Sequence, residues 1–129
     1  MRSFSLALLT SVFSTQLLAT PVAAPVRAEI DALLSTLQSS GCQFNRNDAW
    51  YDAAQAKSHL MDKLAYLEGK DAVQTTEHFI DRAASGSSMS GKPYLVKCDG
   101  SSAVESRHWL STQLKRVRSL QHPAAAGPR

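Results

Sequence analysis

The segment Pro93-Tyr94-Leu95-Val96-Lys97-Cys98 sets this chain apart from an all-helical protein. It is rich in residues that favour strands, and a proline at its first position is compatible with a strand start or a sheet edge. A second short segment, Gln43–Asn47, alternates polar and apolar residues directly after Cys42. If Cys42 pairs with Cys98, the two segments lie side by side. The sequence therefore predicts a two-stranded β element.

The chain has two cysteines, so only one pairing within the molecule is available. An oxidising compartment favours that pairing, and in the chain-entropy estimate the closure of so long a loop stabilises the fold by about 4 kcal/mol. We therefore expect a disulfide between Cys42 and Cys98. Two buried free thiols, or a bridge between two molecules, are the alternatives that the sequence leaves open.

Helical patterns flank and separate the two predicted strands. Apolar side chains at i, i+3, i+4 and i+7 predict an amphipathic helix over residues 28–38, which Ser39-Ser40-Gly41 ends. Three further helices are predicted to begin at capping residues: Asp52, in a capping box with Gln55 and with the helix ending at Gly69; Thr75, with the helix ending at Ser85; and Ser102, in a capping box with Glu105. The side chains expected to share the core are Leu34, Leu60, Leu64, Phe79, Leu110 and Leu114.

Two dipeptides connect the first predicted strand to the second predicted helix. Asn47-Asp48 is typical of a turn. Trp50-Tyr51 directly precedes Asp52, so we expect one of these aromatic side chains to pack onto the helix that follows and the other to be exposed.

These patterns predict an α+β fold, with three to four helices packed on a short two-stranded β element and one disulfide. About one hundred residues remain once an N-terminal leader is set aside, which is enough for one core. We expect a single globular domain over residues 25–121. The tail over residues 122–129 is rich in proline, glycine and alanine and is expected to be disordered.

The N-terminal residues have the pattern of a secretory signal peptide. Arg2 precedes a run from Phe4 to Ala19 that holds no charged residue. Polar residues dilute this run and prolines interrupt its continuation, so it falls short of the ~20 apolar residues of a membrane-spanning helix. We predict a signal peptide over residues 1–24, cleaved between residues 19 and 28, with no integral membrane segment after cleavage. The expected location is periplasmic or secreted, and a retained membrane anchor is the alternative.

Charge and histidine placement argue against two classes of partner. Fourteen basic and eleven acidic residues leave the chain near neutral, whereas a nucleic-acid binder draws its affinity from many phosphate contacts. We therefore expect no nucleic acid. The four histidines lie one in each predicted helix after the first and one in the tail: His59, His78, His108 and His122. A di-metal helical site needs two Glu-x-x-His pairs and the chain has one, so we expect no metal, no cofactor and surface roles for the histidines.

The glycine- and serine-rich loop over residues 85–93 matches no catalytic motif. In a phosphate-binding loop a strand precedes the glycine-rich turn and a helix follows, which is the reverse of the order predicted here. A nucleophile elbow requires Gly-x-Ser-x-Gly, and around Ser88 the last position is Ser90. We predict no catalytic residue, and enzymatic activity is the less favoured reading.

The same loop is the predicted binding site. Loops held by a rigid scaffold often carry binding residues, and here Lys92 supplies a charge and Tyr94 an amphipathic ring. The predicted binding residues are Ser87, Ser88, Ser90, Gly91, Lys92 and Tyr94. The alternative is that the serines and glycines only turn the chain and that Tyr94 belongs to the core.

Three stretches carry a family resemblance: Trp50–Ala53, Phe79–Ser85 and, above all, Ser87–Val96. They are similar to the YfeK-like family of small bacterial periplasmic proteins, and the likeness covers nearly all of the predicted domain. The resemblance implies an exported, single-domain protein and brings no activity, because the function of that family is unknown. The pentapeptide Ser90-Gly91-Lys92-Pro93-Tyr94 is also similar to the Ser-Gly-x-x-Tyr loop of periplasmic lysozyme inhibitors, which are small β-barrels.

The sequence thus predicts an exported binding or inhibitory module. We expect it to contact an envelope protein or a peptidoglycan fragment through the loop from Ser87 to Tyr94. A small envelope hydrolase or transferase that uses serine or acidic residues of the same region is one alternative. A structural envelope protein without a ligand is the other.

Overall fold

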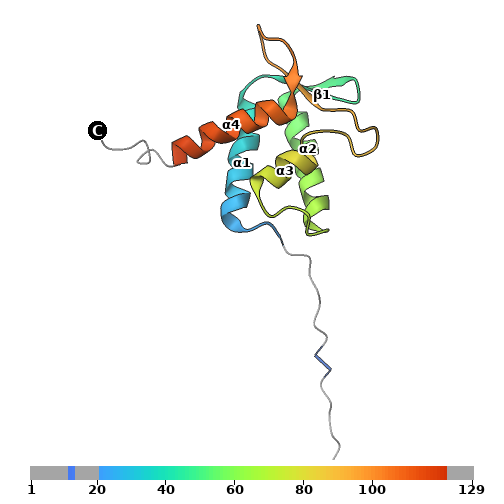
Figure 1. Ribbon diagram of the computed structural model, residues 1–129, viewed down its shortest axis with the longest axis vertical. Helices are drawn as coiled ribbons and strands as arrows, with labels where there is room; N and C mark the ends of the chain where they lie inside the picture. Colours follow the sequence, from blue (N-terminus) through green and yellow to red (C-terminus); the bar gives the residue numbers. More distant parts are fainter. Residues whose placement is uncertain (1–11, 14–20, 122–129) are drawn as a thin grey trace, which may run out of the picture.

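The structure is a computed structural model that describes residues 12–13 and 21–121 (Figure 1). The predicted tail over residues 122–129 lies outside the described residues, as does most of the predicted signal peptide over residues 1–24. Helices and short strands alternate along the described part of the chain, in the order α1, β1, β2, α2, α3, β3, β4, α4.

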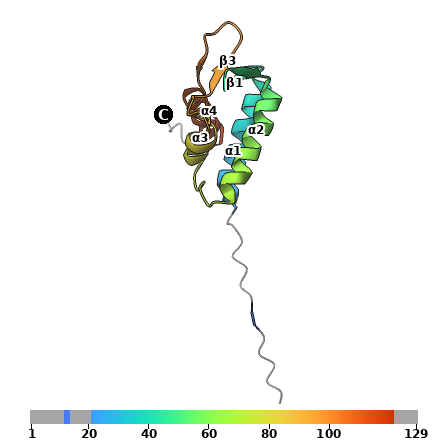
Figure 2. The ribbon, with the colours of Figure 1, turned by 90° about the vertical axis from the view of Figure 1, so that its right-hand side faces the viewer.

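Helix α1 is the centre of the helical layer. The helices are α1 (Ala24–Ser39), α2 (Ala53–Glu68), α3 (Thr76–Ala83) and α4 (Ser106–Gln121). Helix α1 contacts each of the other three, and Figure 2 shows it side by side with α2. It begins at Ala24 rather than at Ala28, because Pro25 fits the first helical turn, where its missing N–H is not needed.

Helices α2 and α3 begin at the predicted caps. The Asp52 carboxylate accepts the backbone N–H of Gln55 at 2.8 Å, and the Gln55 side chain accepts the backbone N–H of Asp52 at 3.3 Å. The hydroxyl of Thr75 accepts the backbone N–H of His78 at 3.1 Å. Each cap satisfies N–H groups that a helix N-terminus otherwise leaves unpaired, so these two boundaries follow from local sequence alone.

The strands form one antiparallel sheet of four strands, so the two-stranded element predicted from the sequence is incomplete. The strands are β1 (Gln43–Arg46), β2 (Ala49–Tyr51), β3 (Leu95–Lys97) and β4 (Val104–Glu105), in the spatial order β2-β1-β3-β4. The predicted pair is its centre, since β1 and β3 lie antiparallel with Phe44 opposite Val96. Four helices on this sheet confirm the α+β class.

Strand β2 exists because of the turn before it. Asn47 and Asp48 have φ angles of 51° and 67°. Two consecutive residues with positive φ reverse the chain with the twist of a two-residue hairpin. Trp50 therefore continues as a strand residue paired with Asn45, and it is 42% exposed. Tyr51 is half-buried.

Strand β4 replaces the helix start that was predicted after Ser102. The capping box of Ser102 and Glu105 is wrong, because Val104–Glu105 pairs with β3 at the edge of the sheet. Helix α4 begins only at Ser106, whose backbone N–H donates to the carbonyl of Tyr94 at 2.8 Å. The pairing of β3 with β4 therefore takes the place of the predicted cap at Ser102.

One hydrophobic core joins the helices to the inner face of the sheet. The six core residues predicted from helical periodicity are all buried: Leu34, Leu60, Leu64, Phe79, Leu110 and Leu114. Phe44, Val96 and Tyr94 join them from the sheet and from the residue before β3. The periodic apolar stripes therefore identified the inner faces of α1 to α4 correctly.

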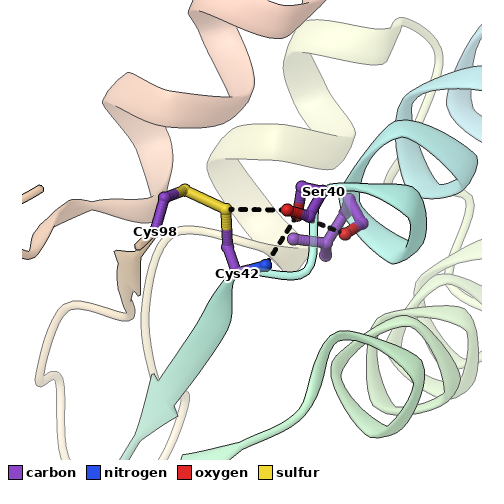
Figure 3. Close-up of a disulfide and its surroundings, with 4 residues drawn as sticks. Ser40, Cys42 and Cys98 are labelled. Carbon is purple, nitrogen blue, oxygen red and sulfur yellow. Dashed lines mark hydrogen bonds between the residues drawn. A yellow bond between two sulfur atoms is a disulfide. The ribbon is translucent and has the colours of Figure 1, made fainter. Parts of the chain in front are cut away.

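Cys42 and Cys98 form the predicted disulfide (Figure 3). It links the residue before β1 to the residue after β3, with the two Cα atoms 4.2 Å apart. The Ser40 hydroxyl prepares this approach, because it accepts the backbone N–H of Cys42 at 3.1 Å and donates to the carbonyl of Leu37 at 2.6 Å. Neither cysteine is free, which excludes the two alternatives left open by the sequence.

Candidate functional site

The predicted binding loop is closed upon itself. Gly86 and Pro93 form an isolated β-bridge at its base. Within it, the backbone N–H of Ser87 donates to the carbonyl of Lys92 at 2.9 Å, and the N–H of Gly91 donates to the carbonyl of Ser87 at 3.0 Å. Gly91 has a φ of 72°, a conformation that glycine adopts without strain. The loop is therefore a compact turn that can hold its residues in place.

The loop is also fastened to the β1–β2 turn. The Ser90 hydroxyl donates to Asn47 Oδ1 at 2.7 Å, and Lys92 Nζ forms an ion pair with Asp48 Oδ2 at 2.5 Å. Lys92, expected to present a charge to a partner, thus has its charge balanced by a carboxylate of the same chain. These two contacts join segments that are far apart in the sequence.

The predicted binding residues have different environments. Ser88, Ser90, Gly91 and Lys92 are exposed. Ser87 is buried, and its Oγ accepts the backbone N–H groups of Met89 and Ser90 at 3.3 and 3.2 Å.

Tyr94 belongs to the core. It is 2% exposed, and its ring lies 5.2 Å from that of Phe44. The binding prediction expected an exposed aromatic anchor at this position, and the buried ring does not provide one. Tyr94 nevertheless lines a surface cleft together with Lys63, which donates to its hydroxyl.

That cleft, of about 370 Å³, lies between α2 and the loop. Polar and charged side chains from four parts of the chain converge on it, and the exposed side chains of Tyr66 and Met89 flank it. Its lining residues are Arg46, Asn47, His59, Asp62, Lys63, Tyr66, Ser87, Ser88, Met89 and Tyr94. Two of the predicted binding residues besides Tyr94, namely Ser87 and Ser88, contribute to it.

The Tyr94 hydroxyl is the centre of the polar contacts in the cleft. Lys63 Nζ donates to it at 3.1 Å and to the carbonyl of Gly86 at the same distance. His59 Nε2 lies 3.4 Å from the same hydroxyl. Helix α2 thus brings His59 and Lys63, one helical turn apart, onto a single oxygen that belongs to the sheet side of the cleft.

Arg46 completes the cluster from the end of β1. Its guanidinium contacts the ring nitrogens of His59 and lies 5.4 Å from the centre of the Tyr51 ring. Because a guanidinium only donates hydrogen bonds, the contacted imidazole nitrogen must be an acceptor, and His59 is therefore neutral in this arrangement. Arg46 and His59 also line a smaller hollow of about 140 Å³ beside Phe44 and Tyr51.

Burial and the charges of the cluster shift the pKa values of three of its side chains. Burial lowers the pKa of His59, and the positive charges of Arg46 and Lys63 lower it further against the opposing charge of Asp62. Burial, and then Arg46, lower the pKa of Lys63. Burial raises the pKa of Tyr94, so its hydroxyl keeps its hydrogen at neutral pH.

Arg46 and His59 were not among the residues predicted to act. The sequence assigned His59 a surface role because no second histidine stands at metal-binding spacing. A different signal was present: His59, Asp62, Lys63 and Tyr66 recur at i, i+3, i+4 and i+7. This spacing places four polar or aromatic side chains on one face of α2, which borders its leucine stripe.

Two kinds of feature are absent from the described residues, 12–13 and 21–121. No three His, Cys, Asp or Glu side chains among them come together as metal ligands. None of the helices in this part of the chain has the length and apolar character needed to cross a bilayer.

Comparison with known proteins confirms the family resemblance seen in the sequence. A family model described as "Family of unknown function (DUF5329)" matches residues 24–118. The "Uncharacterized protein YfeK" of Salmonella typhimurium (strain LT2) is 41% identical over 68 residues, which cover 52% of this chain and 55% of that protein. The chain thus spans about half the length of this relative. No solved structure matches the chain.

Proposed function

The chain belongs to the DUF5329 family of unknown function, and from that premise we propose that it is an exported binding module that seats a small envelope ligand. The site is the cleft between α2 and the loop from Ser87 to Tyr94. A soluble peptidoglycan fragment is the ligand class that we favour over an envelope protein. An inhibitory role would follow if such binding blocked access of another protein to that fragment.

Export is supported by two observations. The N-terminal residues have the charge and hydropathy pattern of a signal peptide. The Cys42–Cys98 disulfide is the state expected in an oxidising compartment.

The observation that carries the binding proposal is the cleft itself. Ligand sites are concave and combine apolar walls with a few polar groups that converge from different elements. Here Tyr66 and Met89 supply exposed apolar surface, while Arg46, Lys63 and the Tyr94 hydroxyl converge on the interior. A concave site of this size suits a small fragment better than the flat face of a folded protein.

The hydrolase or transferase remains the second candidate, because titratable side chains line the cleft. Nucleophilic catalysis by serine requires a hydrogen bond between the nucleophile and its base. Within the described residues, no hydrogen bond joins a serine hydroxyl to His59 or Lys63, and Ser87 Oγ is occupied by two backbone N–H groups. We therefore favour binding over catalysis.

The test is a titration of the isotope-labelled exported protein with soluble peptidoglycan fragments, followed by NMR. We expect shifts confined to the residues that line the cleft. Ser88→Trp places a large side chain at the exposed edge of the cleft and should abolish the shifts. Ser58→Trp adds the same side chain to an exposed position of α2 outside the cleft and should leave them intact. Shifts located elsewhere, or unchanged in Ser88→Trp, would overturn the proposal, as would capture of a folded envelope protein at this cleft in place of any fragment.

A further inference from the structure

We propose that the cleft recognises an oxyanion, a carboxylate or phosphate group of its ligand, at Arg46, Lys63 and the Tyr94 hydroxyl. The inference rests on the proposed function, since it names the chemistry of the group that the same cleft holds. It is carried by two independent observations, the balance of charges around the cleft and the direction of its hydrogen bonds.

The positive charges of the cleft are not balanced by ion pairs. Within the described residues, four other cationic side chains form ion pairs with carboxylates: Arg27, Lys92, Arg107 and Arg118. Arg46 and Lys63 form none in this part of the chain, although both are half-buried. A half-buried cation without a counter-ion is costly, and a bound anion removes that cost.

The hydrogen bonds of the cluster leave donors rather than acceptors for a ligand. When the imidazole nitrogen Nδ1 of His59 accepts from Arg46, the neutral ring carries its hydrogen on Nε2, which faces the Tyr94 hydroxyl. That oxygen then accepts from both His59 and Lys63, so its own hydrogen is free to donate outward. Arg46 also lies 3.0 Å from Nε2 of His59, so this tautomer is part of the proposal, whereas the free hydrogen of Lys63 does not depend on it.

Lys63 and Ser87 add further donors. An ammonium has three hydrogens, and Lys63 uses two of them on Tyr94 and Gly86. Ser87 lines the cleft, and its Oγ accepts two backbone N–H groups, which leaves its hydroxyl hydrogen available as a donor. A ligand group that only accepts hydrogen bonds fits this arrangement, and carboxylates and phosphates are such groups.

Asp62 limits where the anionic group can lie in the cleft. It is the acidic residue among those lining the cleft, and it is exposed. Its charge lies close enough to His59 to oppose the burial and the positive charges that lower the pKa of that ring. We therefore expect the anion to sit on the Arg46 and Lys63 side of the cleft, away from the exposed carboxylate.

The experiment uses the exported full chain and two probes, inorganic phosphate and acetate, at an ionic strength held constant with sodium chloride. Binding is followed by NMR shifts of the cleft residues. Both probes should bind weakly, and Lys63→Met should weaken binding about tenfold or more, because a charge-assisted hydrogen bond is lost. Lys57→Met is the matched control, since Lys57 lies on the same helix and bonds to Gln38 outside the cleft. It removes the same charge and should change the affinity less than about twofold.

A second variant protects the test against a folding defect in Lys63→Met. Tyr94→Phe keeps the buried ring and removes only the hydroxyl donor, so it should also weaken anion binding while the far-ultraviolet circular dichroism stays that of the parent. Equal affinity of Lys63→Met, Lys57→Met and the parent for both probes would overturn the inference, as would shifts that appear with chloride alone.

The two proposals fail in different ways. If peptidoglycan fragments bind in the cleft with the same affinity to Lys63→Met as to the parent, the oxyanion assignment is wrong and the binding module stands. If phosphate or acetate binds in the cleft as described and no fragment does, the oxyanion site stands and the envelope ligand is wrong.

Discussion

At the scale of single residues, the most informative side chain is His59. It is held neutral by a guanidinium that can only donate to it, and it lies between Arg46 and Lys63 with Asp62 as the opposing charge. Burial of the ring, and then the positive charge of Arg46, make protonation of His59 unfavourable in the folded state. In the unfolded chain no such neighbour is fixed in place.

This difference predicts how stability depends on pH. Because the pKa of His59 is lowered by folding, the unfolded chain binds more protons than the folded one below about pH 6.5, the ordinary histidine pKa. The free energy of unfolding should therefore fall as the pH is lowered from 7.5 to 5.5. His59→Gln, which keeps an acceptor for Arg46, should flatten this fall.

Urea unfolding of both proteins at the two pH values measures the effect. The range from pH 7.5 to 5.5 stays above the ordinary pKa of carboxyl groups. Glu77 is one such group, and its hydrogen bond with Arg118 lowers its pKa further, so its contribution to stability is lost only at more acidic pH. An equally steep fall in His59→Gln would show that another group is responsible.

At the scale of elements, the boundary between what the sequence predicts and what it does not is the boundary between local and long-range contacts. The caps Asp52 and Thr75 act on N–H groups three residues away, so they could be predicted directly from the sequence. Strand β4 could not, because Glu105 forms a strand only when β3 lies beside it. The sequence did not decide which of Trp50 and Tyr51 is exposed: the hairpin at Asn47 makes Trp50 an exposed strand residue and leaves Tyr51 half-buried.

The candidate site divides in the same way. The loop could be found from its composition, and Ser87 and Ser88 do line the cleft. The cationic cluster could not, because Arg46 and Lys63 come from a strand and a helix whose relative placement depends on the core. Both residues approach Tyr94. The sequence alone did not decide whether this tyrosine is an exposed binding residue or part of the core.

Helix α2 provides a direct test of packing. Leu64 is fully buried on its inner face, so Leu64→Ala should lower the free energy of unfolding by about 2–5 kcal/mol. Leu120→Ala, at the 81% exposed end of α4, is the control and should change it by less than about 0.5 kcal/mol. Denaturant unfolding followed by circular dichroism decides between these values, and a loss below about 1 kcal/mol for Leu64→Ala would contradict the packing of α2.

A double variant of the loop tests whether its fastening to the β1–β2 turn matters for ligand binding while the fold is kept. Ser90→Ala combined with Lys92→Ala removes both contacts with the β1–β2 turn. Both are exposed, so the double variant should lose no more than about 1 kcal/mol of stability. Ligand binding in the cleft should nevertheless weaken, because the loop that carries Ser87 and Ser88 is no longer fastened to the β1–β2 turn, where Asn47 lines the same cleft. Undiminished binding by the double variant would mean that the loop serves only as a connector.

At the scale of the whole molecule, the start of α1 bears on the mature N-terminus. Val22 and Val26 pack against the core, and Arg27 forms ion pairs with Asp31 and Glu68. Cleavage as late as Ala28 would remove these contacts.

We therefore predict that the mature protein begins between Thr20 and Pro25 and contains no free thiol. Intact-mass measurement of the protein isolated from expressing cells, with and without alkylation before reduction, tests both points. A mass that includes Met1, a start after Pro25, or alkylation of either cysteine without reductant would contradict the prediction.

The position of the disulfide has a topological consequence. Residues 42 to 98 form a closed covalent ring, while α1 and α4 are the two arms that leave it. Every residue that lines the cleft, from Arg46 to Tyr94, belongs to the ring. A single protease nick at the fully projecting Met89 would open the ring without separating its two halves, so the nicked protein should run as one species until it is reduced. The walls of the cleft are thereby tethered to each other twice, once through the peptide chain and once through sulfur.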